Sequence, residues 1–216
     1  DAKFFWDKDK SKNLIKQIAK LKDVKFYEGL GSVYDKTQRL RKLSGMLADE
    51  FNLNKEKAEI AASISKSDLC SDLVNEYPDL QGLLGKYFAL SQGFEEDVSN
   101  AVSDHYLPLG NNSMTSKKPI SYVVAISDKI DTLVGFFLIN EKPTSSKDPF
   151  ALRRSAIGLL RTIIDNKLNL KLRNLISYNI KLLEDQGVKK VNKNSENEIL
   201  SFLKERMKNI LREKNI

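Results

Sequence analysis

The sequence predicts an all-α protein, and two observations carry that prediction. Apolar residues recur every three or four positions along most long segments, which places them on one face of a helix. Pro, Gly, Asn and Ser gather mainly between these segments, where they interrupt or end helices. Only the stretch Val24–Tyr27 suggests a strand, and no internal repeat is present.

The expected helices follow from this spacing. They cover about residues 11–22, 33–47, 55–76, 79–90, 94–106, 119–140, 148–165, 168–183 and 195–215. Gly29 and Gly31 mark a turn before the second helix, and Ser32 is its expected N-cap. Ser195 with Glu198 predicts a capping box at the start of the last helix.

Three segments without this spacing complete the outline. The opening DAKFFW is an aromatic cluster that we expect to be packed, because an exposed one would promote association. The loop at residues 107–118 is rich in Gly, Asn, Ser and Pro and is expected to be mobile. The segment EDQGVKKVNKNS is expected to be a linker.

The composition indicates what kind of partner the protein binds and in which redox environment it folds. The 216 residues carry a net charge of +7 and a pI of about 9.3. This balance favours a polyanionic partner, nucleic acid before a membrane surface, although lysines spread over solvated helix faces give the same number. The single cysteine, Cys70, excludes an intrachain disulfide and indicates a reducing compartment. No signal peptide is visible, and a start at Asp1 suggests a piece of a longer protein.

The most apolar helix lies at the centre of the sequence. It runs from Pro119 for about 21 residues, which is long enough to suggest a membrane span. Asp128, Lys129 and Asp131 near its middle argue against that, because each charge costs roughly 2.5–3.5 kcal/mol on insertion. Since two carboxylates on a buried helix need partners, we predict an ion pair between Arg153 and Asp128 or Asp131.

The next helix is basic. Asp148 followed by Pro149 predicts its start, with Asp as the N-cap and Pro at the first helical position. Arg154 and Arg161 share its polar face, where each can contact a phosphate or a partner's carboxylate. A merely solvated basic face explains the same pattern equally well.

Catalytic signatures are mostly absent from the sequence. It has no phosphate-binding GxxxxGK[ST], no GxSxG and no CxxC. One histidine, His105, cannot build a two-histidine metal site, and such a residue more often makes an ordinary hydrogen bond than acts in catalysis. The pairs Asp68/Asp72 and Asp128/Asp131 are more often salt-bridged than metal-binding. We therefore predict no catalytic residue and no metal site.

Several longer motifs give a more specific indication. The blocks DAKFFW, LGSVYDKTQRL, KSDLCSDLVNEYPDLQGLLGKYFAL, DHYLPL, ISDKIDTLVGFF and SKDPFALRR occur in this order. Together they resemble the β-subunit of the bacterial tetrameric glycyl-tRNA synthetase over almost the whole chain. The resemblance implies an HD-domain-like helical bundle over residues 1–186. It also implies a linker and a first helix over 187–216 that lead into a missing anticodon-binding domain, as a C-terminal helical extension.

True HD domains hold a metal ion through a His, a His-Asp pair and a distal Asp, and use it for phosphate ester hydrolysis. The resemblance places Gly31 at the first His, Ser67 and Asp68 at the His-Asp pair, and Asp128 at the distal Asp. Both imidazoles are missing, so it implies a vestigial site without hydrolase activity. An HD-type metal phosphohydrolase remains the less favoured alternative.

The resemblance also implies a function and partners. The whole enzyme joins glycine to its tRNA with ATP and Mg²⁺, whereas this fragment holds no cofactor. Its implied role is to bind the tRNA for glycine through salt-dependent phosphate contacts, in the cytoplasm and without a membrane. Its implied partners are the α-subunit and a second β-subunit in a heterotetramer. The candidate tRNA-binding residues are Arg39, Arg41, Lys42, Lys117, Lys118, Lys147, Arg154 and Arg161. A structural or subunit-docking domain without tRNA affinity is the main alternative.

Overall fold

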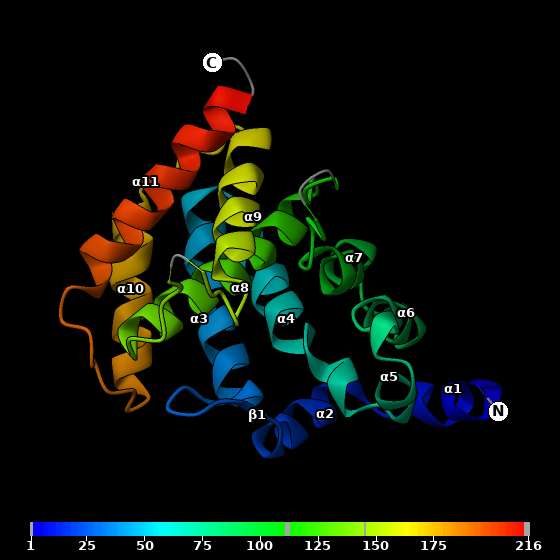
Figure 1. Ribbon diagram of the computed structural model, residues 1–216. Helices are drawn as coiled ribbons and strands as arrows, with labels where there is room; N and C mark the ends of the chain where they lie inside the picture. The colour runs from blue at the N-terminus through cyan, green and yellow to red at the C-terminus, as the bar shows by residue number, and fades with distance from the viewer. Residues whose placement is uncertain (1, 111–112, 145, 214–216) are drawn as a thin grey trace. The chain divides into compact units, whose positions relative to one another are not determined.

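The computed structural model describes residues 2–110, 113–144 and 146–213 (Figure 1). Helices dominate these ranges, which confirms the all-α prediction. The chain forms two compact units, Asp1–Tyr106 with Lys118–Val124, and Leu107–Lys117 with Ala125–Ile216. The predicted division after residue 186 does not coincide with the boundary between these units. In the described part of the chain, no helix has the length and apolar character needed to cross a membrane.

The first unit is built mainly from short helices packed around one longer helix, Val33–Glu50. Its elements are α1 (Ala2–Lys10), α2 (Leu14–Lys20), η1 (Leu21–Asp23), β1 (Lys25–Tyr27), β2 (Gly31–Ser32), α3 (Val33–Glu50), α4 (Lys55–Ile64), η2 (Ser67–Cys70), α5 (Asp72–Glu76), η3 (Pro78–Leu80), α6 (Leu83–Ser91) and α7 (Glu96–Asp104). The helix α8 (Pro119–Leu138) begins in this unit and continues in the second.

Helices α3 and α4 form the centre of the first unit and lie side by side (Figure 1). Leu40, Leu43 and Leu47 of α3 are fully buried, and so are Ala58 and Ala61 of α4. The small alanine side chains permit a close approach of the two helix backbones, which supports dense packing.

The start of α3 matches the sequence prediction. β1 pairs with β2 in an antiparallel hairpin, so the suggested strand is present. The Ser32 side chain accepts a hydrogen bond from the Asp35 backbone, and the Asp35 side chain accepts one from the Ser32 backbone. This capping box satisfies two backbone donors that the helix itself leaves unpaired.

The opening aromatic cluster belongs to a helix, α1, that the sequence did not predict. Trp6 stacks on Phe88 of α6, with ring centroids 5.2 Å apart, whereas Phe4 is 67% exposed. Asp9 anchors the helix end, because its buried carboxylate accepts hydrogen bonds from Leu73 N at 2.7 Å and from Lys12 at 2.6 Å. The prediction of packing is therefore confirmed for Trp6 and not for Phe4.

The single helix predicted over residues 55–76 was wrong, because the chain turns twice within it. α4 ends at Ile64, η2 spans Ser67–Cys70, and α5 begins at Asp72. The Asp68 side chain accepts a hydrogen bond from Gly82 N, and Ser71 caps α5 by accepting one from Val74 N. These side chains bind backbone donors outside the α4 helix and so compete with its continuation.

The second unit contains the rest of α8 with α9 (Leu152–Asp165), α10 (Leu172–Asp185) and α11 (Ser195–Glu213). Ile126, Ile130, Leu133 and Leu138 of α8 are fully buried. Together with the apolar faces of α9, α10 and α11 they form the core of this unit. Figure 1 shows α11 running beside α9 and α10.

One predicted helix start and one predicted capping box differ from the structure. α9 begins at Leu152, four residues after Asp148. The Asp148 carboxylate accepts hydrogen bonds from the first two backbone amides of this helix, Leu152 N at 2.8 Å and Arg153 N at 2.9 Å. Asp148 therefore caps the helix, while Pro149 is not its first residue. The predicted capping box of α11 is not formed. Ser195 Oγ is buried and has no hydrogen-bond partner among the described residues, and Glu198 binds Lys142 and Asn192 instead.

Candidate nucleic-acid interface

The two units divide the charge of the chain unequally. The first unit holds 17 Lys and Arg against 18 Asp and Glu, a net charge of −1. The second holds 19 Lys and Arg against 11 Asp and Glu, a net charge of +8. The whole positive balance that the sequence shows therefore belongs to the second unit.

The clearest group of cations in the second unit lies on α11. Lys204, Lys208 and Arg212 follow one another at intervals of four residues, so they share one face of the helix. All three are exposed, and within the described residues none has an ion-pair partner. Intervals of four residues correspond to a rise of about 6 Å per step. The sequence analysis missed this row, although its spacing is readable from the sequence.

Three predicted tRNA-binding residues belong to the first unit and to α3. Arg41 and Lys42 are exposed, as predicted. Arg39 is only 1% exposed, so the prediction that it lies on a free helix face was wrong. Its neighbour Lys36 is also buried, with its ammonium 4.7 Å from the centre of the Phe26 ring of β1. The hairpin covers part of the face of α3 that the sequence pattern predicts to be solvated.

Two further candidates hold the loop at residues 107–117 against α9. Arg161 donates hydrogen bonds to the carbonyl oxygens of Ser113 at 2.8 Å and Gly110 at 3.3 Å. Lys117 Nζ donates to the carbonyl oxygen of Asp165 at 3.0 Å. Asn166 Nδ2 donates to Ser116 O at 2.8 Å. These hydrogen bonds attach the loop to α9 and argue against the prediction that it is mobile. Residues 111 and 112 of the loop lie outside the described residues.

The remaining candidates are accessible. Lys118, Lys147 and Arg154 are exposed, and within the described residues no ion pair engages them. Lys118 belongs to the first unit, and the other two belong to the second. Gly158, which the pattern places on the same face as Arg154, is buried against Lys129 and Pro108. The free basic face of α9 is therefore narrower than the sequence indicates.

The predicted ion pair of Arg153 with Asp128 or Asp131 was wrong, because Arg153 contacts other acceptors. The Arg153 guanidinium donates to the carbonyl oxygen of Thr144 and lies 3.9 Å from the Asp148 carboxylate. Asp131 is fully buried and accepts a hydrogen bond from Asn179 Nδ2 at 3.2 Å. Asp148 sits at the start of the same helix as Arg153, so it is the nearer acceptor for the guanidinium.

Three of the four predicted vestigial HD positions lie in the first unit, and Asp128 lies in the second. Gly31 has a φ of +81°, and a Cβ there would lie 2.5 Å from Asp35 Oδ2. A histidine at this position would be strained and would disturb the α3 cap. Ser67 Oγ is buried, and in the part of the chain that the structure describes it has no hydrogen-bond partner.

Asp68 is almost completely buried. Its Oδ2 accepts hydrogen bonds from Gly82 N at 2.6 Å and Gly85 N at 3.3 Å, while no described residue donates a hydrogen bond to Oδ1. Burial raises the pKa of this carboxyl group, and the two amides and the nearby Lys66 charge oppose that rise. Asp68 thus ties η2 to the start of α6.

The only histidine is engaged on both ring nitrogens. Lys66 Nζ lies 2.8 Å from His105 Nε2, and Nδ1 lies 3.1 Å from the carbonyl oxygen of Ala101. A lysine ammonium only donates, so Nε2 accepts and Nδ1–H donates to Ala101. Neither nitrogen offers a lone pair to a metal. Among the described residues, no group of three or more His, Cys, Asp or Glu is placed to hold a metal ion.

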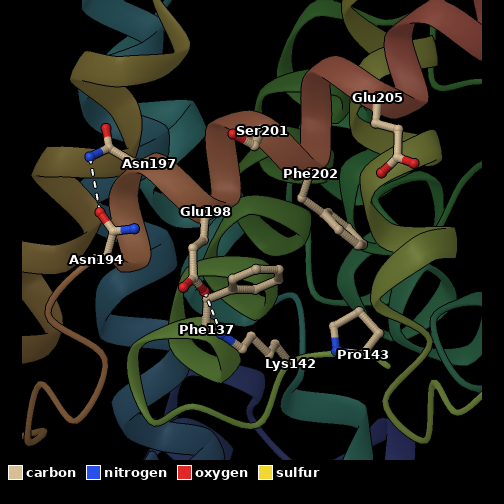
Figure 2. A pocket seen from close by; sticks show the side chains of 9 residues that line it. All are labelled: Phe137, Lys142, Pro143, Asn194, Asn197, Glu198, Ser201, Phe202 and Glu205. Atoms are coloured by element: carbon tan, nitrogen blue, oxygen red, sulfur yellow. Dashed lines mark hydrogen bonds and ion pairs between the residues drawn. The ribbon is translucent and has the colours of Figure 1, made fainter. Parts of the chain in front are cut away.

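The second unit has one further feature, a pocket of about 340 Å³ between α11 and the segment after α8 (Figure 2). Phe137, Pro143 and Phe202 supply its apolar wall, and the two phenyl rings meet edge to face with centroids 5.2 Å apart. Its polar lining consists of Lys142, Asn194, Asn197, Glu198, Ser201 and Glu205.

An ion pair closes one side of the pocket (Figure 2). Lys142 Nζ lies 2.8 Å from Glu198 Oε2, which also accepts a hydrogen bond from Asn192 at 2.9 Å. These two contacts, with the one from Lys142 the stronger, lower the pKa of Glu198. The carboxylate is therefore ionised at neutral pH.

Comparison with known proteins identifies the family. The family model "Glycyl-tRNA synthetase beta subunit" matches residues 1–216. The chain is 42% identical to the glycine–tRNA ligase beta subunit of Colwellia psychrerythraea, over 100% of this chain and 31% of the relative. It is 40% identical to that of Rhodospirillum centenum, over 100% of this chain and 30% of the relative. The chain spans about 30% of the length of these relatives, and it belongs to the glycyl-tRNA synthetase beta subunit family.

Proposed function

We propose that this chain is a tRNA-binding part of a glycine–tRNA ligase β-subunit and that its second unit makes the contacts. The observation that carries the proposal is the net charge of +8 on that unit, with Lys204, Lys208 and Arg212 exposed in a row on α11. Cations in such a row neutralise successive phosphates, and the binding that results depends on salt rather than on sequence.

The names of the relatives supply the context of this proposal. A beta subunit implies an α-subunit as a partner, with which the enzyme attaches glycine to its tRNA at the expense of ATP. On this proposal the chain holds tRNA in place for a reaction whose chemistry takes place elsewhere in the enzyme. The heterotetramer, the cytoplasmic location and the degenerate HD site are parts of the same proposal.

The test is binding of this chain to tRNA for glycine and to a minihelix of its acceptor stem across a salt series. We expect affinity for both to fall steeply between about 50 and 200 mM salt. The variant Lys204→Gln/Lys208→Gln is expected to bind roughly tenfold more weakly. Its log–log salt slope should be smaller by about two, because each lost phosphate contact removes about one unit.

The chain offers a matched control for that variant. Lys16 and Lys20 of α2 are also exposed lysines four residues apart, and they lie in the first unit. Lys16→Gln/Lys20→Gln removes the same charge from the chain. We expect it to change tRNA affinity by less than about twofold. Equal losses in both variants, or no binding by the unaltered chain at low salt, would contradict the proposal.

A second candidate function, subunit docking, is favoured by one observation in the first unit. Leu83, Tyr87 and Leu90 of α6 follow at intervals of four and three residues, and they are 45%, 49% and 38% exposed. Such an apolar stripe on a helix is typical of a surface that packs against another chain. Co-migration of this chain with the α-subunit in size-exclusion chromatography, lost on Tyr87→Lys, would support this function.

The HD-type phosphohydrolase has no such support. The reaction needs a metal ion to activate water, and both ring nitrogens of His105 are already occupied by Lys66 and Ala101 O. The proposal of a degenerate site instead assigns Asp68 a structural role, as an acceptor for the Gly82 and Gly85 amides.

A further inference from the structure

We propose that the pocket beside Phe202 receives a single unstacked nucleotide of the bound tRNA. The inference rests on the proposed function and goes further, because it assigns a base-binding site in addition to phosphate contacts. Proteins commonly recognise single-stranded RNA by placing a base against an aromatic or guanidinium plane and binding its edge with polar groups. The pocket provides both kinds of group.

The apolar part of the pocket suits a planar ring. Phe137, Pro143 and Phe202 line it, and the Phe137 and Phe202 rings meet edge to face (Figure 2). Arg206 does not line the pocket, but its guanidinium lies over one face of the Phe202 ring, 3.7 Å from the ring centre, and so holds the ring in place. At about 340 Å³, the pocket lies in the size range of small-ligand sites.

The polar part of the pocket favours bases with amino groups. Glu198 and Glu205 both line it, and each uses its Oε2 for a cation, Lys142 or Arg206. Among the described residues, no hydrogen bond is made to the Oε1 atom of either carboxylate. A carboxylate oxygen accepts hydrogen bonds from the exocyclic amino group of cytosine and equally from the other amino-bearing bases. Uracil lacks such a group and should bind least well.

The pocket and the cation row share the helix α11. By helical spacing, the pocket residues Asn197 and Ser201 lie on the same face of the helix as Lys204 and Lys208. A single strand whose base enters the pocket therefore has exposed lysines beside its neighbouring phosphates. This arrangement of a base site next to a basic track is that of single-strand-binding grooves.

A fluorescent side chain in the pocket tests the proposal. The single tryptophan, Trp6, lies in the first unit, so a Trp6→Phe/Phe202→Trp variant carries its only indole at the pocket. Binding of tRNA for glycine is followed in parallel by fluorescence anisotropy of labelled tRNA. We expect saturation with tRNA to quench the indole emission, because a stacked base quenches an indole. Binding seen by anisotropy without a change in emission would overturn the pocket and leave the proposed function intact, whereas no binding at all would overturn both.

Salt dependence separates a base contact from a phosphate contact. Phe202→Leu keeps an apolar side chain and removes the ring, and it should weaken tRNA binding roughly tenfold with an unchanged salt slope. Phe150→Leu is the matched control. Phe150 also stacks on a ring of α8, with centroids 4.2 Å apart, but does not line the pocket. Equal effects of the two variants on affinity would contradict the proposal.

The nucleotide preference gives an independent readout. In the Trp6→Phe/Phe202→Trp variant, the four nucleoside 5′-monophosphates are compared with ribose 5-phosphate. We expect CMP, GMP and AMP to quench more strongly than UMP, and ribose 5-phosphate not to quench. Equal quenching by ribose 5-phosphate and the nucleotides would show a phosphate site and would overturn the base pocket.

Discussion

The two units of this chain use charged side chains in opposite ways. The first unit buries Asp9, Lys36, Arg39, Lys66, Asp68 and His105, whereas in the described part of the second unit Asp131 is the buried ionisable residue. The second unit instead has a net charge of +8, and its exposed cations lie both on helices, such as Lys204 and Lys208 of α11, and between helices, such as Lys189 and Lys190.

This difference shows that a basic composition says little about where a protein binds an anion. A buried cation is surrounded by protein and serves to order its neighbours, as Lys66 does for His105. An exposed cation without a partner is available to a phosphate. Substitution of a buried charge should therefore change the stability of the protein, whereas substitution of an exposed cation should change its affinity for tRNA.

Removing the Asp68 carboxylate should destabilise the first unit most strongly. Asp68→Ala leaves the buried amides of Gly82 and Gly85 without their acceptor. We expect a loss of about 3 kcal/mol in the free energy of unfolding, measured by urea denaturation. Asp79→Ala, an exposed carboxylate in the nearby η3, is the control and should change it by less than about 0.5 kcal/mol. A small effect of Asp68→Ala would mean that the buried charge network is dispensable.

Within the second unit, Arg161 and Arg154 should separate stability from binding. Arg161→Ala removes the hydrogen bonds to Ser113 O and Gly110 O, so we expect a loss of about 1–2 kcal/mol in stability. Arg154→Ala should leave stability within about 0.5 kcal/mol and weaken tRNA binding by about threefold. Thermal denaturation and a tRNA titration of both variants provide the measurements. A loss of stability in Arg154→Ala but not in Arg161→Ala would contradict the assignment of Arg161 to stability and of Arg154 to tRNA binding.

The ion pair at the pocket should give a small pH-dependent effect. Contacts with Lys142 and Asn192 lower the pKa of Glu198 in the folded state below its ordinary value of 4.5. Its stabilising contribution is therefore present above that value and is lost as the pH falls through the folded pKa. At pH 7 we expect Glu198→Gln to be less stable by about 0.5 kcal/mol, since the pair is partly exposed. Urea denaturation at pH 7 and below pH 4 measures this, and a difference that persists in acid would contradict the assignment.

The smallest effect is expected for the exposed cations of α3. Arg41 and Lys42 belong to the unit with a net charge of −1. Arg41→Gln/Lys42→Gln should change tRNA affinity by less than about twofold, as judged by the same salt titration. A loss of affinity as large as that of Lys204→Gln/Lys208→Gln would show that Arg41 and Lys42 also contact tRNA, so that the interface includes the first unit.

Much of the fold could be predicted from the sequence because helical periodicity is a local signal. The apolar run of α8, the Ser32 cap of α3 and the amphipathic α11 were all readable. The break after Ile64 was not, since it depends on Asp68 binding amides of residues 82 and 85. The actual start of α9 was missed as well, because Asp148 caps it from a distance of four residues.

The candidate interface was predicted less well, for a related reason. The sequence identifies cations but not what covers them. The helical pattern predicts that Arg39 is exposed, but it is buried, and the exposed row at Lys204, Lys208 and Arg212 is not among the predicted tRNA-binding residues. The partners of Arg153 and Arg161 also escaped prediction, because the acceptors are a helix-capping carboxylate and loop carbonyls.

The helical class, the family and the total charge can be read from the sequence alone, since they follow from local spacing, ordered motifs and composition. The three-dimensional structure is needed to show that the positive charge belongs to one unit, that Asp68 and His105 are bound inside the other, and that Phe202 lines a pocket. The physical reason is that burial, ion pairing and hydrogen bonding join residues far apart along the chain, and a local pattern contains no information about those neighbours.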